Sequence, residues 1–264
     1  YMGLFPGVEE SPSDFTARVE SSLSTVDWLQ EKGASLPFSI EKKVPYYDWN
    51  YVNSSLREAF DVRIEPLDAY YSGKSLLLWH GGMTWIFDDG KTHSRCVIQV
   101  KPGKNAMEAL LHEAIHAIRL PLKSVVYEEI FAYMPARSWL RRAFGPLFTK
   151  SFEPAVFLFL YAVGLFGPLF YSGFFSTAAL LGAHSFLAYL LFRLFFRRHK
   201  WQKAYKKAEQ MMGNRKKARY LLFRLTDEEI NFFAKTSLSK LKKWIEEKKA
   251  ADLRWRQIYQ GYFS

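Results

Sequence analysis

The sequence has almost no cysteine and a long stretch without charge, and both absences limit what the protein can be. Cys96 is the single cysteine among 264 residues, which excludes an internal disulfide and a zinc site built from cysteines. A reducing compartment is therefore expected. Residues 154–192 contain no Asp, Glu, Lys or Arg. This uncharged stretch divides the chain into an N-terminal part, an apolar part and a C-terminal part.

The uncharged stretch is long enough for two membrane-spanning helices. A helix needs about 20 apolar residues to cross the hydrocarbon core of a bilayer. Residues 154–171 and 174–192 are both apolar, and Ser172-Gly173 between them favours a turn. The pattern predicts a transmembrane helical hairpin over residues 151–196. Because each half is at the short limit of a span, a re-entrant hairpin and a buried soluble helix pair remain as alternatives.

Positive charge flanks the predicted hairpin on both sides. The net charge of +11 is uneven: residues 1–150 have 17 Lys and Arg against 18 Asp and Glu, whereas residues 197–264 have 19 against 7. The flanking basic residues are Arg137, Arg141, Arg142 and Lys150 before the hairpin, and Arg193, Arg197, Arg198 and Lys200 after it. By the positive-inside rule both flanks are cytoplasmic. We therefore expect an integral membrane protein with its N-terminal domain and C-terminal region on the cytoplasmic side. Nothing before residue 12 has the pattern of a cleavable signal peptide.

The basic C-terminal region, residues 197–264, has helical spacing and Lys-rich faces. A basic helix beside a bilayer gains about 1 kcal/mol per Lys or Arg from anionic headgroups. RNA or DNA is the competing partner for such a charge, but no recognised nucleic-acid motif accompanies it. The expected partner of this region is the lipid bilayer, and no nucleic acid is expected.

The first 150 residues are typical of a soluble α+β domain. Helical spacing occurs around residues 15–32 and 50–60. Two apolar runs around Gly81-Gly82, within residues 74–87, predict a β-hairpin, and residues 95–101 predict a third strand. Asn105 is a suitable N-cap for a helix over residues 106–120, which Pro121 ends.

The predicted helix at residues 106–120 contains His112-Glu113-Ala114-Ile115-His116, an HExxH motif. Residues four apart share a helix face, so both imidazoles can bind one cation while Glu113 takes a proton from a metal-bound water. Zn²⁺ suits these ligands because it lowers the pKa of bound water to about 7. Apolar neighbours indicate a buried helix, and the strand before it is expected to provide the edge to which an extended peptide adds.

A carboxylate for a third metal ligand follows soon afterwards. Ser124 is expected to cap a second helix over residues 125–134, which supplies Glu128 and Glu129 in its first turns as candidates for this ligand. Two His and one Glu, with water in the fourth position, form a common catalytic zinc site. Glu228 and Glu229 are rival ligands in a second acidic segment, although its Thr-Asp-Glu-Glu start is also typical of a helix cap.

Together these residues resemble the gluzincin group of zinc metallopeptidases. In that group an HExxH helix is followed by a helix that supplies the third ligand, commonly within E-x-x-A, and Glu129-Ile130-Phe131-Ala132 matches this pattern. The resemblance covers residues 95–134. It implies a zincin-like α+β domain with a small antiparallel or mixed sheet, a Zn²⁺ ion bound by His112, His116 and Glu129, and Glu113 as the catalytic base. CAAX-processing and heat-shock membrane peptidases look similar, but in them the membrane spans tend to lie between the second His of the motif and the Glu.

Four other residues have less specific signals. His80 and His93 are expected in loops rather than as ligands. His184 lies inside an apolar helix, where a polar side chain favours either a helix-packing hydrogen bond to Ser or Thr or a catalytic role. Tyr133, one turn after Glu129, either packs in the core or donates a hydrogen bond to the reacting substrate.

The sequence therefore predicts a membrane-anchored zinc metalloprotease with three parts: a zincin-like domain (1–150), a transmembrane hairpin (151–196) and a basic helical region (197–264). Its expected substrates are membrane proteins or membrane-proximal peptides. The alternative is a non-catalytic membrane adaptor or sensor with a structural metal site. Glu113 distinguishes the two, because peptide hydrolysis needs a base and a structural site does not.

Overall fold

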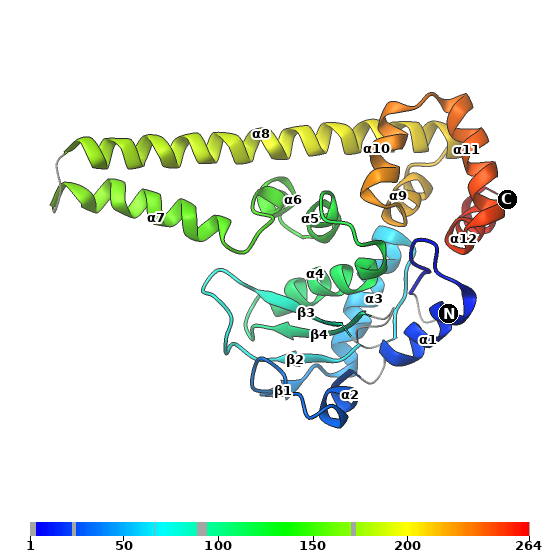
Figure 1. Ribbon diagram of the computed structural model, residues 1–264, viewed down its shortest axis with the longest axis horizontal. Coiled ribbons are helices and arrows are strands. Elements are labelled where there is room, and N and C mark those ends of the chain that lie inside the picture. Colours follow the sequence, from blue (N-terminus) through cyan, green and yellow to red (C-terminus); the bar gives the residue numbers. More distant parts are fainter. Residues whose placement is uncertain (1–3, 23–24, 66, 89–93, 170–172, 264) are drawn as a thin grey trace.

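A computed structural model gives the fold and describes residues 4–22, 25–65, 67–88, 94–169 and 173–263. The described chain is mostly helical and contains one small mixed sheet (Figure 1). This confirms the expected α+β class. The helices of the N-terminal part are α1 (Pro12–Ser22), α2 (Thr25–Glu31), α3 (Tyr46–Phe60), α4 (Ala106–Arg119), α5 (Glu128–Tyr133) and α6 (Trp139–Phe144).

The sheet has four strands in the order β1-β2-β4-β3. They are β1 (Lys42–Lys43), β2 (Ala69–Tyr71), β3 (Gly82–Asp88) and β4 (Ser94–Val100). β2 and β4 are parallel, and the other two pairs are antiparallel. β4 confirms the strand expected at residues 95–101. It is an inner strand, however, so the edge beside the HExxH helix belongs to β3 and not, as the sequence suggested, to the strand that precedes this helix.

The β-hairpin expected within residues 74–87 is wrong. Only Gly82–Asp88 forms a strand there, and it pairs with β4 instead of with residues 74–81. The buried Gln99 side chain explains the difference, because its Nε2 donates to the backbone carbonyls of Ser72 (3.2 Å) and Lys74 (2.6 Å). These hydrogen bonds hold the start of the segment before Gly82 in an irregular conformation.

The two faces of β4 belong to two apolar clusters. Cys96, Ile98 and Val100 pack into the main core, in which α4 and α3 take part, and Val97 packs on the other face in a smaller cluster with Phe38. This alternation follows from the two-residue period of a strand. α4 is therefore fixed between the sheet and the helices above it (Figure 1).

The apolar stretch forms two helices that lie side by side and extend away from the sheet (Figure 1). They are α7 (Glu153–Phe166), continued by a 3-10 turn to Leu169, and α8 (Gly173–Met212). By length and composition α8 can cross a membrane, whereas α7 is a shorter apolar helix. α8 also runs without a break through the boundary expected at residue 196, because helix-forming Lys and Arg simply follow its apolar half.

The C-terminal region is helical, as expected, and it completes the main core. Its helices are α9 (Arg215–Phe223), α10 (Asp227–Lys235), α11 (Leu238–Ala251) and α12 (Leu253–Tyr262). Phe223 stacks on Phe60 of α3 with ring centroids 4.0 Å apart. Trp255 of α12 is fully buried in the same cluster. The N-terminal part and the C-terminal helices therefore share one core, which α8 connects.

Candidate metal centre

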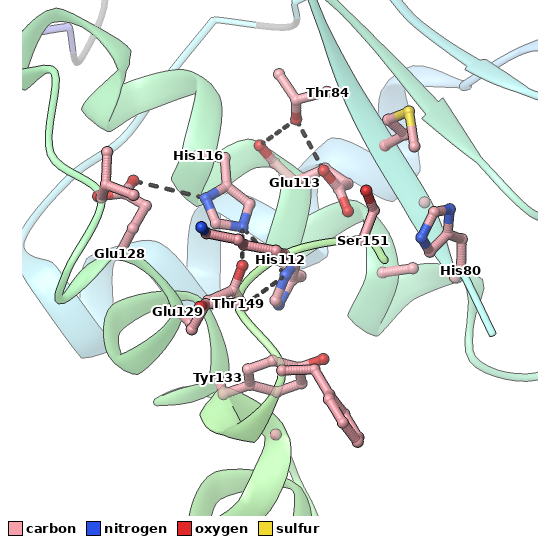
Figure 2. A pocket seen from close by; sticks show the side chains of 18 of the residues that line it. His80, Thr84, His112, Glu113, His116, Glu128, Glu129, Tyr133, Thr149 and Ser151 are labelled. Carbon is pink, nitrogen blue, oxygen red and sulfur yellow. Dashed lines mark hydrogen bonds and ion pairs between the residues drawn. The ribbon is translucent and has the colours of Figure 1, made fainter. Parts of the chain in front are cut away.

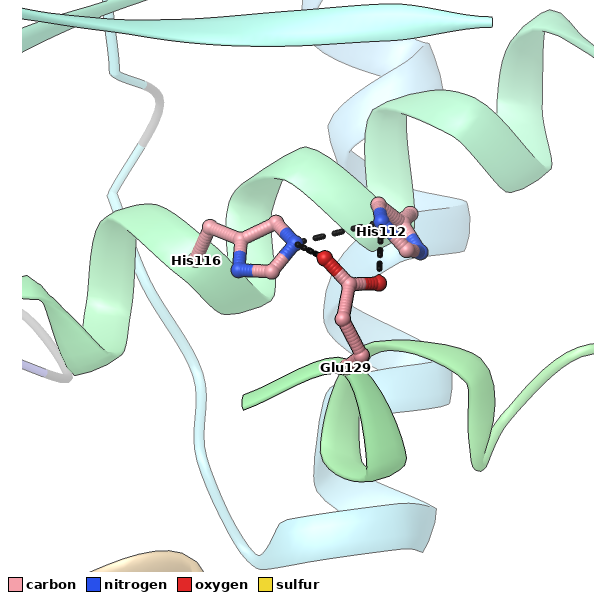
Figure 3. Close-up of side chains that lie close together, drawn as sticks. All are labelled: His112, His116 and Glu129. Atoms are coloured by element: carbon pink, nitrogen blue, oxygen red, sulfur yellow. Dashed lines mark hydrogen bonds and ion pairs between the residues drawn. The ribbon is translucent and has the colours of Figure 1, made fainter. Parts of the chain in front are cut away.

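Two helices bring the three candidate metal ligands together. α4 presents His112 and His116 on one face, one turn apart, while its opposite residues Leu110, Ala114 and Ile118 are buried in the core. α5 crosses this face and directs Glu129 between the two imidazoles (Figure 3). The side chains of the three residues are 16% to 20% exposed. The cluster is therefore sheltered but reachable.

The distances within the cluster match those of a tetrahedral metal site. The Nε2 atoms of His112 and His116 are 3.1 Å apart, and each is 3.5 Å from an oxygen of Glu129. Ligands at 2.0–2.1 Å from a Zn²⁺ ion at tetrahedral angles are separated by about 3.3 Å. The spacing and the donor types therefore fit zinc. We find no other such group among the residues that the structure describes.

α5 begins at Glu128, three residues later than the predicted helix, and Ser124 does not cap it. No side chain of the described residues caps α5. Asp227 of α10 instead holds the segment that leads into it, because its carboxylate accepts the backbone N–H groups of Val125, Val126 and Tyr127 at 2.6, 2.6 and 3.2 Å. A contact over 100 residues in the chain thus fixes the start of the helix that supplies Glu129.

Glu128, an alternative third ligand in the sequence, lies behind the cluster. Its Oε1 is 3.6 Å from Nδ1 of His116 (Figure 2). Its Oε2 accepts a hydrogen bond of 2.8 Å from Nε of Arg119. The fully buried Arg119 also donates to the backbone carbonyls of Phe223 and Leu225. A carboxylate behind a ligating His orients the ring and increases its basicity. Glu128 therefore supports His116.

The electrostatics of the cluster favour a cation. Burial raises the pKa of Glu129 to about 7. Burial lowers the pKa of His116, but Glu128, Glu129 and Glu113 outweigh this effect and raise it to about 9. The pKa of His112 is well below its ordinary value because of burial and the neighbouring His116. Three carboxyl groups, of Glu113, Glu128 and Glu129, surround the two imidazoles, and a divalent ion would neutralise their negative charge.

Glu113 is buried beside the two ligands and is held by the sheet. Oγ1 of Thr84, on β3, donates to Oε2 of Glu113 at 2.9 Å (Figure 2). A Cβ at Gly82 would lie 2.9 Å from Cγ of Glu113 and 2.9 Å from the backbone oxygen of Gln99. Glycine at this position therefore leaves room for Glu113. Burial raises the pKa of Glu113, as is expected for a carboxyl group that exchanges protons near neutral pH.

Tyr133 lies against His112, with ring centroids 4.5 Å apart, and lines the same cleft. Burial raises its pKa to about 12, so its hydroxyl remains a hydrogen-bond donor at neutral pH. A Cβ at Gly145 would come within 2.3 Å of this ring. The sequence treated Tyr133 as either a core residue or a donor to the substrate, and its position in the cleft favours the second role.

The rival carboxylates of α10 do not join the cluster. Glu229 accepts hydrogen bonds of 2.7 and 2.8 Å from Arg254 and one of 2.7 Å from Trp255, and with Thr226 it forms a capping box. Glu228 is exposed. The helix-cap interpretation of this segment is therefore the one that the structure supports.

The remaining histidines have different positions. His80 is in a turn, as predicted, yet it lines the cleft, and its buried Nδ1 has no hydrogen-bond partner among the described residues. Its only signal in the sequence was its place before Gly81-Gly82. His93 lies outside the described residues. Nδ1 of His184 donates to the carbonyl of Leu180 on its own helix at 2.7 Å. The hydrogen bond to Ser or Thr of a packed helix, which the sequence suggested, is therefore not the one that this nitrogen makes.

A cleft of about 730 Å³ opens over the cluster. Its walls are β3, the ligand face of α4, the start of α5 and residues 145–154, which lead into α7. The free edge of β3 and the base of the apolar hairpin therefore border the same cavity. Such a cavity has the size and mixed lining of a ligand site.

Comparisons with protein-family models, with curated proteins and with solved structures found no match.

Proposed function

We propose that the chain is a membrane-anchored zinc metallopeptidase. The observation that carries the proposal is the His112, His116 and Glu129 donor set at tetrahedral spacing, with Glu113 buried beside it in an open cleft. A structural zinc site is usually closed by four protein ligands, whereas three ligands and a cleft leave a position for water and substrate.

The chemistry follows from the residues around that position. A zinc ion held by His112, His116 and Glu129 would supply a Lewis acid, which would lower the pKa of a water molecule to about 7 and polarise a carbonyl group. Glu113 takes the proton from the attacking water and returns it to the leaving amine. The Tyr133 hydroxyl donates a hydrogen bond to the oxygen on which negative charge develops. Thr84 fixes the carboxylate of Glu113 during these transfers.

The walls of the cleft indicate an extended peptide as the substrate. Among the residues that the structure describes, β3 is paired on one side only, so its other edge offers backbone N–H and C=O groups. A peptide can add to such an edge as a further strand. Residues 145–154 place the other wall at the start of α7. Membrane proteins and membrane-proximal peptides are therefore the proposed substrates.

The surface of α7 and α8 supports the membrane anchor. Of the 18 most apolar consecutive residues of α8, 17% are buried, whereas the core helix of a soluble protein is mostly buried. Large apolar side chains such as Phe159, Phe166 and Phe175 are more than 60% exposed. Soluble monomers rarely expose such patches. The basic flanks orient the domain and the C-terminal region toward the cytoplasm.

Zinc content and hydrolysis test the proposal together. The purified wild-type chain should contain about one zinc ion and cleave peptides or membrane proteins in a chelator-sensitive manner. His116→Ala should lose both properties because it removes a ligand. His199→Ala is a matched control, since His199 is an exposed residue of α8 outside the cluster, and it should retain both.

The outcomes separate the two function classes. Equal zinc content in His116→Ala and the wild type would show that the site is wrong. A zinc-containing wild type that hydrolyses nothing across broad peptide and membrane-protein libraries would favour the adaptor with a structural metal.

A further inference from the structure

A second cavity, of about 380 Å³, lies on the other side of the segment that starts α5. It is lined by Val126, Tyr127, Tyr189, Phe192, Arg193, Phe196, Arg197, Lys200 and Asn231. It shares no lining residue with the cleft over the metal cluster. Six of its residues come from α8, at the level where the apolar half of this helix passes into its basic half.

The α8 residues form one continuous helix face. Their spacing of three, four, seven, eight and eleven residues from Tyr189 follows the helical period. The aromatic members Tyr189, Phe192 and Phe196 are 56%, 61% and 45% exposed. Arg193 lies between Phe192 and Phe196, and Arg197 and Lys200 follow them toward the C-terminal end. The face is therefore apolar at one end and cationic at the other.

Two cations of this face have no fixed partner. Arg193 donates to the carboxylate of Glu153 at 2.6 and 2.8 Å. Arg197 and Lys200, in contrast, make no hydrogen bond and no ion pair within 4.0 Å among the residues that the structure describes. The neighbouring Asp227 uses its oxygens for three backbone N–H groups. No carboxylate is among the lining residues.

We propose that this cavity, referred to as the α8 cavity, binds one anionic phospholipid. The inference rests on the proposed membrane placement of α8. Arg197 and Lys200 bind the headgroup phosphate, and the aromatic residues contact the acyl chain beside the apolar half of the helix. A soluble anion would use the charges and leave the exposed aromatic face uncovered, whereas a lipid covers both.

Lipid retention by the full chain in detergent tests this site. The delipidated protein is incubated with equal amounts of phosphatidylglycerol and phosphatidylcholine, and retained lipid is measured by native mass spectrometry. The wild type should retain one phosphatidylglycerol. Arg197→Gln combined with Lys200→Gln should weaken retention about 30-fold, because each basic side chain contributes about 1 kcal/mol. Soluble glycerol phosphate should not compete.

Lys203→Gln combined with Lys206→Gln is the matched control. Both residues are exposed on α8, lie outside the cavity and carry the same total charge. This variant should bind like the wild type. Equal loss in both double variants, equal retention of the two lipids by the wild type, or competition by glycerol phosphate would overturn the proposed site.

A flotation assay separates this inference from the proposed function. All three proteins should float with vesicles of phosphatidylcholine alone, because α7 and α8 and not the cavity would hold them there. Failure of the wild type to float would overturn the membrane anchor and the lipid site together. Flotation without preferential retention of phosphatidylglycerol would overturn the lipid site alone, and zinc-dependent hydrolysis would be unaffected.

Discussion

At the scale of single residues, the geometry of the proposed ligands depends on charged groups that do not belong to the HExxH motif. Glu128 contacts both His116 and Arg119. Arg119 in turn donates to the carbonyls of Phe223, the last residue of α9, and Leu225, two residues later. The guanidinium also lies 4.3 Å from the ring centroid of Phe131. The metal centre is thus joined through one buried cation to the C-terminal half of the core.

Glu128→Gln should therefore weaken zinc binding without abolishing it. The amide can still accept a hydrogen bond from Arg119, but it no longer orients and polarises the His116 ring as a carboxylate does. We expect a 10–100-fold loss of zinc affinity, measured by competition with a chelator. Glu228→Gln, on an exposed residue of α10, is the control and should bind zinc like the wild type. Identical zinc affinities of the two variants would show that Glu128 does not support zinc binding.

At the scale of elements, small residues allow α7 and α8 to lie against each other. A Cβ at Gly164 would be 2.5 Å from the Leu180 side chain, and one at Gly167 would be 2.6 Å from Oγ of Ser176. Small residues at such crossings allow close backbone approach in membranes. The two glycines therefore form part of the surface on which the first apolar segment contacts α8.

Gly164→Ala should destabilise the helix pair by about 1–3 kcal/mol through overpacking. Gly182→Ala provides the comparison, since a Cβ at Gly182 meets nothing within 4 Å and alanine favours a helix. Thermal unfolding in detergent should show a lower midpoint for the first variant and an unchanged or higher one for the second. The reverse order would show that the two helices do not pack in this way.

The contact between α10 and α12 contains the buried pair of Glu229 and Arg254. Burial opposes ionisation of Glu229, but the hydrogen bonds from Arg254 and from the backbone of Thr226 outweigh it and lower its pKa. The ionised carboxylate therefore stabilises the fold above the pKa of the unfolded chain, about 4.3. This stabilisation is lost as the pH falls through the lower pKa of the folded chain.

Glu229→Gln should accordingly reduce the free energy of unfolding by about 3 kcal/mol at pH 7, because Arg254 is left buried without its counter-charge. The difference from the wild type should shrink as the pH falls below about 4. Urea unfolding at pH 7, 5 and 3.5 measures it. A difference that is constant with pH would mean that the charge of Glu229 does not stabilise this contact.

At the scale of the whole molecule, local patterns predicted the elements better than their connections. The helical period placed α4 within a residue of its observed end, and the apolar run placed α7 and the first half of α8. β1 and β2 were missed because strands of two and three residues have no measurable period. The segment before Gly82 was misassigned because a buried side chain, Gln99, binds its backbone, and no local pattern signals such a contact.

In the proposed metal centre, too, some residues could be predicted from local patterns and others could not. Spacing alone put His112 and His116 on one helix face. Spacing alone did not identify Glu129, and the resemblance was needed as well. The position of Glu129 beside the two histidines depends on Asp227, which lies about 100 residues later in the chain and holds the segment before α5. The role of Glu128 behind His116 and the place of His80 in the cleft depend on tertiary packing, which the sequence does not display.

The most direct test of the central claim is the turnover of Glu113→Gln. The amide is nearly isosteric, can still accept from Thr84 and is not a proposed ligand. Zinc content and thermal unfolding should therefore equal those of the wild type, while peptide hydrolysis should fall by about 10²–10⁴-fold. The measurement is cleavage of reconstituted membrane-protein and peptide substrates, scored by mass spectrometry with a chelator control. Wild-type turnover in a zinc-replete Glu113→Gln protein would contradict the mechanism.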